Sequence, residues 1–289
     1  MNLKRYISDN KFLIIPGVFD GLTALLAHRQ GFKAMYMTGY GVTASYLGMP
    51  DAGLATYTEF ADRISMLTAA SPLPLIADAD TGFGGPANIE RTIRGFEKAG
   101  ASAIQIEDQQ SPKRCGHVDG KTVIPAEEMA IKVKIACDSR RSSDTMIIAR
   151  SDALATHGLD EALGRCELYA KAGADILFVD APVDEEQLAR IGGAFDTPTM
   201  ANVVPGGKTP VVSADTLAEM GFAFAIYPSI ALLAAADAIK NVYADLAAAG
   251  IPNTVGGRMT AEQGNELFGF GHIRALEQRY ATAAEASDV

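Results

Sequence analysis

The chain of 289 residues lacks the features that mark membrane and secreted proteins. No apolar run reaches the roughly 18 residues that a membrane-spanning helix needs. The first six residues lead to Asp9 and Asn10 before an apolar stretch begins, which argues against a signal peptide. We therefore expect a cytoplasmic protein without a membrane partner.

Cysteine, histidine and clustered basic residues are also scarce. The three cysteines have no paired spacing, which argues against a disulfide scaffold and fits a reducing compartment. The four histidines form no cluster at zinc-ligand spacing, so a zinc site is not expected. A net charge of −10 with dispersed Lys and Arg predicts no nucleic-acid partner. An acidic protein that binds an acidic substrate needs local positive charge, from a metal or from a few placed Arg and Lys residues.

Eight short apolar runs recur along the chain, and most are continuous rather than alternating, which is typical of parallel strands buried on both faces. Helical patterns separate them, and no G-x-G-x-x-G follows the first run, as it would in an open dinucleotide-binding sheet. The pattern therefore predicts an α/β fold, a (β/α)8 TIM barrel. The expected strands are 13–18, 34–38, 74–78, 102–106, 146–150, 175–180, 199–203 and 222–227, and the expected helices are 21–30, 57–70, 87–99, 126–138, 159–172, 185–191 and 213–220.

Further helical sequence follows the eighth expected strand. Residues 231–250 and 260–283 supply more helix than one barrel needs. We expect a single barrel domain over residues 1–289 with a C-terminal helical extension at about 231–289. The surplus helices are expected to pack on another subunit, which predicts a homo-oligomer.

Carboxylates lie at the ends of four successive predicted strands. The C-terminal strand ends of a barrel form one face, and this face carries the chemistry. Like charges gathered there repel one another unless a cation lies among them, and hard oxygen ligands suit Mg²⁺ or Mn²⁺. The residues are Asp78, Asp80, Glu107, Asp108, Asp152 and Asp180.

A polar, cationic segment with spaced glycines follows the fourth predicted strand, and its composition predicts a mobile loop. Lys113, Arg114 and His117 flank Cys115, and positive charge of this kind lowers the pKa of a thiol. Cys115 is therefore a candidate acid–base group, with a packing role as the alternative. Arg150, at the end of the fifth predicted strand, adds a second cationic position, and the two positions together suit a substrate with two carboxylates.

Lys113-Arg114-Cys115-Gly116-His117 closely resembles the K-[KR]-C-G-H signature of the isocitrate lyase and phosphoenolpyruvate mutase superfamily. Further segments that resemble the family follow in family order along nearly the whole chain. They are residues 36–41, 49–51, 78–84, 106–109, 149–153 and 201–202. The branches that the chain resembles most are the 2-methylisocitrate lyases and 2,3-dimethylmalate lyases.

This resemblance implies a magnesium-dependent carbon–carbon lyase that cleaves a 2-hydroxy di- or tricarboxylate to a 2-oxo acid. It implies that Asp78 contacts Mg²⁺ directly, while Asp51, Asp80 and Glu107 hold water molecules of the ion. It also implies a homotetramer whose subunits exchange C-terminal helices.

The resemblance further assigns roles in catalysis and in substrate binding. Tyr36 is the implied base, Cys115 the implied acid, and Arg150 a contact to the 2-oxo acid part of the substrate. The remaining expected substrate contacts are Thr38, Gly39, Tyr40, Arg114, Gly116, His117 and Asn202.

Three residues depart from the family pattern and leave the exact substrate open. Thr38 stands where Ser is usual, Asp180 where Glu is common, and Pro205 where most relatives carry Glu or Thr. The decarboxylase and phosphonate mutase branches lack the cysteine signature, whereas oxaloacetate hydrolases keep it and are the main alternative. A non-catalytic metabolite-binding barrel is the alternative from another class, and the intact set of polar residues argues against it.

Overall fold

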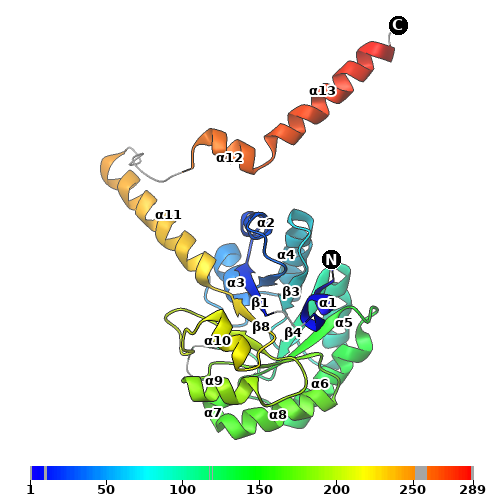
Figure 1. Ribbon diagram of the computed structural model, residues 1–289, viewed down its shortest axis with the longest axis vertical. Coiled ribbons are helices and arrows are strands. Elements are labelled where there is room, and N and C mark those ends of the chain that lie inside the picture. Colours follow the sequence, from blue (N-terminus) through cyan, green and yellow to red (C-terminus); the bar gives the residue numbers. More distant parts are fainter. Residues whose placement is uncertain (1, 10–11, 117, 119, 251–258, 288–289) are drawn as a thin grey trace. The chain divides into compact units, whose positions relative to one another are not determined.

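The computed structural model describes residues 2–9, 12–116, 118, 120–250 and 259–287. The chain divides into two compact units, Met1–Ala235 and Ala236–Val289. The first contains all eight strands and is an α/β barrel, whereas the second is helical (Figure 1).

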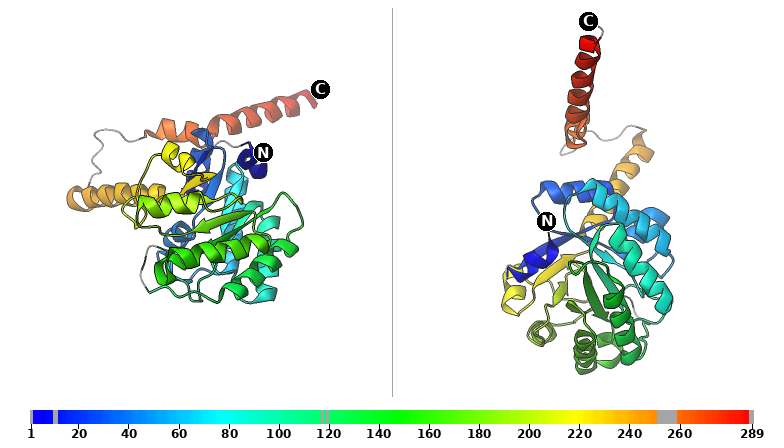
Figure 2. Two further views of the ribbon diagram at one scale, coloured as in Figure 1. Left: turned by 60° about the horizontal axis from the view of Figure 1, so that its bottom comes forward. Right: turned by 90° about the vertical axis from the view of Figure 1, so that its right-hand side faces the viewer.

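The eight strands are all parallel and are hydrogen-bonded in the order β6-β5-β4-β3-β2-β1-β8-β7. A parallel bridge between Leu177 and Thr199 brings the two end strands, β6 and β7, together. Helices surround the strands (Figure 2), and the predicted TIM barrel is confirmed. The strands are β1 Leu13–Val18, β2 Met35–Met37, β3 Leu75–Asp78, β4 Ala101–Glu107, β5 Met146–Ser151, β6 Ile176–Val179, β7 Met200–Asn202 and β8 Phe224–Tyr227.

The seven helices expected between strands are present, each within one residue of its predicted ends. They are α2 Gly21–Arg29, α4 Tyr57–Ala70, α5 Pro86–Lys98, α6 Ala126–Ser139, α8 Leu159–Lys171, α9 Glu185–Gly192 and α10 Ala214–Glu219. The sequence pattern does not predict three short helices, namely α1 Leu3–Ser8, α3 Gly39–Leu47 and α7 Leu154–His157. α7 offers a single turn, which is too short for an apolar period to emerge, and the first turn of α3 contains two glycines, which weaken a helical pattern.

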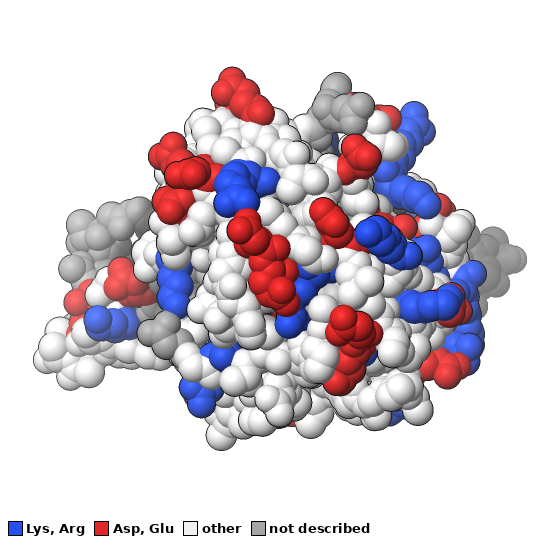
Figure 3. All heavy atoms as spheres, turned by 90° about the horizontal axis from the view of Figure 1, so that it is seen from below, with Lys and Arg blue, Asp and Glu red and all other residues white. Residues whose placement is uncertain are grey.

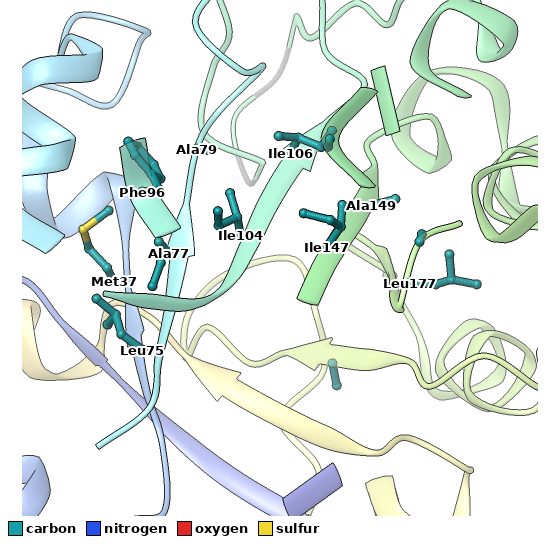
Figure 4. Close-up of a cluster of buried hydrophobic side chains, with 14 of the residues drawn as sticks. Met37, Leu75, Ala77, Ala79, Phe96, Ile104, Ile106, Ile147, Ala149 and Leu177 are labelled. Carbon is teal, nitrogen blue, oxygen red and sulfur yellow. The ribbon is translucent and has the colours of Figure 1, made fainter. Parts of the chain in front are cut away.

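Successive residues of the strands serve two different hydrophobic clusters. In β3, Leu75 and Ala77 belong to the cluster between strands and helices, whereas Ile76 belongs to the cluster inside the barrel. Figure 4 shows the first of these clusters, with Ile104 and Ile106 of β4 among its members. The alternation therefore turns the residue between those two, Gln105, toward the barrel interior.

The C-terminal helices carry large apolar side chains on their surface. After α11 Ile230–Ala249 come α12 Ala261–Leu267 and α13 Phe270–Ser287. Phe270, Ile273 and Tyr280 of α13 are all exposed. Within the described residues, none of the helices has the length and apolar character that crossing a membrane requires. The expected exchange of helices between subunits stays a prediction.

Acidic and basic side chains are mixed on the face of the molecule that Figure 3 shows. Blue and red residues alternate there rather than gather into a large patch of one sign.

Candidate active site

A cavity of about 300 Å³ opens among residues at the C-terminal ends of the strands. This is the face on which barrel enzymes carry their chemistry. Most of the residues expected to form the site line it, although they come from several different strand ends and loops. These lining residues are Tyr36, Thr38, Tyr40, Asp51, Asp78, Cys115, Gly116, Arg150 and Asn202.

Gly39, Asp80 and Glu107 do not line the cavity but contact residues that do. The backbone N–H of Gly39 donates to Asp78 Oδ2 over 3.3 Å. Asp80 is ion-paired with Lys113, and Glu107 Oε2 lies 3.4 Å from Arg150 Nε.

The structure does not bring Arg114 into the cavity, and its side chain is exposed. The reason lies in the backbone, because Gln109 accepts from the N–H of Arg114 and donates to its carbonyl, over 2.9 and 2.8 Å. These two bonds fix residue 114 on the outside of the loop. The remaining expected contact, His117, lies outside the described residues.

The N-terminus of α3 faces the acidic end of β3. Thr38 is the N-cap, and its hydroxyl accepts from the N–H of Gly41 over 3.2 Å. A Cβ on Gly39 would lie 2.9 Å from Asp78 Oδ2, so this close approach favours glycine. Because the first N–H groups of a helix lack intrahelical partners, they can bind an anion. The N–H groups of Gly39 and Gly41 already donate to Asp78 and Thr38, and the substrate contacts expected of residues 38–40 stay a prediction.

A cation does lie among the clustered acids, and it is the ammonium group of Lys113. Lys113 Nζ lies 2.6 Å from Asp51 Oδ1 and 2.7 Å from Asp80 Oδ1, and the side chain is buried. Burial lowers the pKa of Lys113, but the carboxylates of Asp80, Glu107 and Asp51 raise it well above its ordinary value. Burial raises the pKa of Asp80 from 3.8 to about 7, although Lys113 opposes the shift. The sequence alone associates this lysine only with the thiol.

The acidic side chains of the site suit a divalent ion that keeps water ligands better than an ion bound by protein atoms alone. No three acidic, histidine or cysteine side chains of the described part of the chain are grouped closely enough to hold a metal ion. However, Glu107 Oε1 is buried and accepts no hydrogen bond from any described residue. Burial raises the pKa of Glu107 well above its ordinary value. Mg²⁺ usually keeps several water molecules and takes only one or two carboxylates, which suits such an arrangement.

Arg150 is held rigidly by two carboxylates. Its Nε and Nη2 donate to Asp152 over 2.8 and 2.9 Å, and Nη2 also donates to Asp180 Oδ2 over 2.8 Å. The guanidinium carbon lies 5.1 Å from the ring centroid of Phe178. Burial lowers the pKa of Arg150, but the charges of Asp152 and Asp180 outweigh this and raise it well above its ordinary value, so the side chain stays charged. A preorganised guanidinium of this kind can bind a carboxylate with little loss of side-chain entropy.

The loop that carries Cys115 packs against Arg150 and its partners Asp152 and Asp180. The N–H of Cys115 donates to the carbonyl of Asp51 over 3.2 Å. Buried Lys121 donates to the carbonyl of Gly116 over 2.5 Å and to Asp152 over 2.8 Å. A Cβ on Gly116 would lie only 1.6 Å from Asp180 Oδ2, so no other residue fits there. The mobility expected for this loop stays a prediction.

A buried network behind the cavity holds Asp152 in turn. Asp108 accepts hydrogen bonds from the N–H of Asp152, the hydroxyl of Ser151 and the hydroxyl of Tyr169, each over 2.8 Å. Arg165 Nη1 adds a bond of 3.3 Å. Asp108 is therefore placed to support the site from behind rather than to contact a ligand.

We expect Asp108→Asn to lower the free energy of unfolding by about 3 kcal/mol, because among the described residues it leaves the buried Arg165 guanidinium with the more exposed Glu161 as its one charge partner. Urea denaturation of the two proteins measures the difference. Asp138→Asn is the matched control, since its ion pair with Lys134 is exposed and should contribute less than about 0.5 kcal/mol. Equal losses in both variants would contradict the supporting role.

Sequence reasoning missed Lys121, Phe178 and Gln105 as parts of the site. For Gln105 a signal was available, because it is a polar amide inside a predicted strand that is otherwise apolar. Phe178 is indistinguishable from a core residue in sequence.

Comparisons with known proteins identify the family of this chain. The family model described as phosphoenolpyruvate phosphomutase matches residues 3–247. A 2,3-dimethylmalate lyase from Eubacterium barkeri is 43% identical over 97% of both chains, and a 2-methylisocitrate lyase from Bacillus subtilis is 42% identical over 83% of this chain and 79% of its own. The structure of a phosphonopyruvate hydrolase in complex with oxalate and Mg²⁺ matches with a TM-score of 0.86 and 30% identity, and covers 96% of this chain and 98% of its own. The chain therefore belongs to the phosphoenolpyruvate mutase/isocitrate lyase superfamily and is a carbon–carbon lyase.

Proposed function

We propose that this lyase is magnesium-dependent and cleaves a 2-hydroxy di- or tricarboxylate of the 2,3-dimethylmalate or 2-methylisocitrate type to a 2-oxo acid and a second carboxylate. The observation that carries the proposal is the cavity itself. It places a phenol, a thiol and a guanidinium around one space beside a cluster of buried acids. Such a set can take a proton, return a proton and hold a carboxylate in one chamber.

Four acids would hold the ion. Asp78 would bind it directly, and Asp51, Asp80 and Glu107 would hold its water molecules. The unpaired Oε1 of Glu107 supports this assignment, as does the Mg²⁺ in the related hydrolase. When bound, the ion supplies positive charge to the oxygens of the 2-oxo acid part of the substrate. Mn²⁺ has similar ligand preferences and should substitute.

The chain's own residues then divide the remaining work. The N–H groups at the start of α3 and the Arg150 guanidinium bind the carboxylate of the 2-oxo acid part. Gly116 and Asn202 also line the cavity and bind the second carboxylate. Tyr36, in its ionised form, accepts the proton of the 2-hydroxyl and becomes a neutral phenol. After the C–C bond breaks, the Cys115 thiol donates its proton to the carbon of the departing fragment and becomes a thiolate.

Part of the cavity wall is apolar, which supports an alkyl substituent on the substrate. Phe178, Val204, Pro205 and Leu233 line it. Among the described lining residues, the cationic side chains are Lys113 and Arg150, and both are already paired with acids. Because the described residues offer a third substrate carboxylate no free cationic partner in the cavity, a dicarboxylate of the 2,3-dimethylmalate type fits better than a tricarboxylate.

A substrate panel tests the proposal. We expect 2,3-dimethylmalate to have a kcat/KM at least about tenfold above that of 2-methylisocitrate, because an unpaired charge in an apolar site costs more than about 1.4 kcal/mol. The assay follows formation of the 2-oxo acid with Mg²⁺ present, and isocitrate and oxaloacetate complete the panel. Turnover of oxaloacetate alone would replace the lyase proposal by an oxaloacetate hydrolase.

A further inference from the structure

Gln105 lies between two residues of the proposed machinery and is completely buried. Its amide oxygen accepts from the hydroxyl of Tyr36 over 3.1 Å. Its amide nitrogen donates to Asp78 Oδ1 over 3.3 Å. The three side chains come from the neighbouring strands β2, β3 and β4. Asp78 and Gln105 are register partners, whereas Tyr36 pairs with Ile76, two residues before Asp78. Gln105 is thus the link between the base and the metal-binding end of the site.

The direction of the two bonds is determined by chemistry. An ionised carboxylate can only accept, so Asp78 takes the N–H of the amide, and the amide oxygen must face Tyr36. The opposite orientation would place an amide oxygen against a carboxylate oxygen. The phenol proton of Tyr36 therefore points at Gln105 and away from the cavity, and a lone pair of the phenol oxygen is left to face the cavity.

A phenol held in this way can accept a hydrogen bond from a substrate hydroxyl. Without Gln105, the Tyr36 hydroxyl could turn its proton toward the substrate. It would then donate a hydrogen bond to the substrate hydroxyl instead of accepting one from it. Gln105 can also serve the ionised phenol, because turning its amide over presents an N–H to Tyr36 when Asp78 is engaged with another partner. Burial is the largest cause that raises the pKa of Tyr36 well above its ordinary 10, and the charge of Asp78 is the next. The ionised phenol therefore needs such a donor.

We propose that Gln105 is a positioning residue of the lyase reaction, which accepts the Tyr36 hydroxyl proton, turns a lone pair of the phenol oxygen toward the substrate and links Tyr36 to Asp78. The inference rests on the proposed function, because it takes Tyr36 as the base. It adds a residue that acts on the base and does not itself touch the substrate.

Gln105→Met tests this, because methionine has a similar volume and makes neither hydrogen bond. We expect kcat to fall at least about tenfold, as misplacement of a reacting group commonly costs this much or more. The dissociation constant of oxalate with Mg²⁺ and the KM should change less than about threefold, since the groups that bind carboxylates remain. In a Tyr36→Phe background, the same substitution should lower the remaining kcat less than about twofold, because the residue would act through Tyr36 alone.

A matched control separates positioning from stability. Ser71→Ala removes another buried hydrogen bond, 3.3 Å long, from the segment before β3. It should lower the melting temperature about as much as Gln105→Met and leave kcat unchanged. The inference is overturned if Gln105→Met keeps kcat within about threefold of wild type, or if kcat, oxalate binding and melting temperature fall together beyond the control. Wild-type protein that cleaves no lyase substrate would remove the proposed function itself, which is a different result.

Discussion

Cys115→Ser is expected to lower lyase turnover at least about a hundredfold, within the range that general acid catalysis contributes. A serine hydroxyl occupies a similar volume but is far less acidic than a thiol, so it protonates a carbanion poorly. The loop backbone should stay in place, because the docking bonds to Asp51 and Lys121 use backbone atoms of residues 115 and 116. The measurement is kcat on the best lyase substrate, together with oxalate binding in the presence of Mg²⁺, which should survive.

Cys137→Ser is the matched control for this variant. Cys137 lies on α6 and its thiol donates to the carbonyl of Gly173 over 3.1 Å, a bond that serine can also make. This variant should keep full activity. If Cys115→Ser keeps more than about a tenth of the wild-type kcat, the residue is not the proton donor, because loss of a general acid costs more than that.

Removal of divalent cations should abolish activity, by at least about a thousandfold, because metal ions commonly supply several kcal/mol of charge stabilisation in such reactions. Without the ion, Lys113 provides the positive charge next to Asp51 and Asp80. An ammonium group there does not replace an ion that binds the substrate oxygens. Mg²⁺ or Mn²⁺ added after EDTA should restore turnover.

The test requires protein whose metal content has been measured after dialysis. EDTA that is already saturated with Mg²⁺ is the control for direct effects of the chelator. Full activity in protein with far less than one ion per chain would reject the metal assignment and with it the roles given to Asp78 and Glu107.

The barrel could be predicted from sequence because its strands and helices differ in period and are separated by clear turn signals. The predicted strand ends are also sufficient to place Asp78, Glu107 and Arg150 on one face. A strand position fixes the direction of its side chain, so these residues could be assigned with few alternatives. The helix α3 was missed because its first turn contains two glycines, which weaken a helical pattern.

The loop after β4 was harder to predict. Its residues follow no period, so the sequence could not tell that Lys113 turns inward and Arg114 outward. That difference depends on the ion pairs of Lys113 with Asp51 and Asp80, which are distant along the chain. It also depends on the two hydrogen bonds between the Gln109 side chain and the backbone of residue 114. The role of Gln105 likewise depends on partners from two other strands.

The close approach of Gly116 to Asp180 also limits the access of solvent to Arg150 from the side of the loop. The backbone there lies so near the Asp180–Arg150 pair that even a Cβ at position 116 would overlap both side chains. Arg150 therefore acts in a medium of low dielectric constant, where its attraction for a carboxylate is much stronger than in bulk water. Even a methyl group at position 116 would hold the loop away, admit solvent and weaken that attraction. The absence of a side chain at this one position thus lets the loop backbone cover one side of the guanidinium, while the other side faces the cavity.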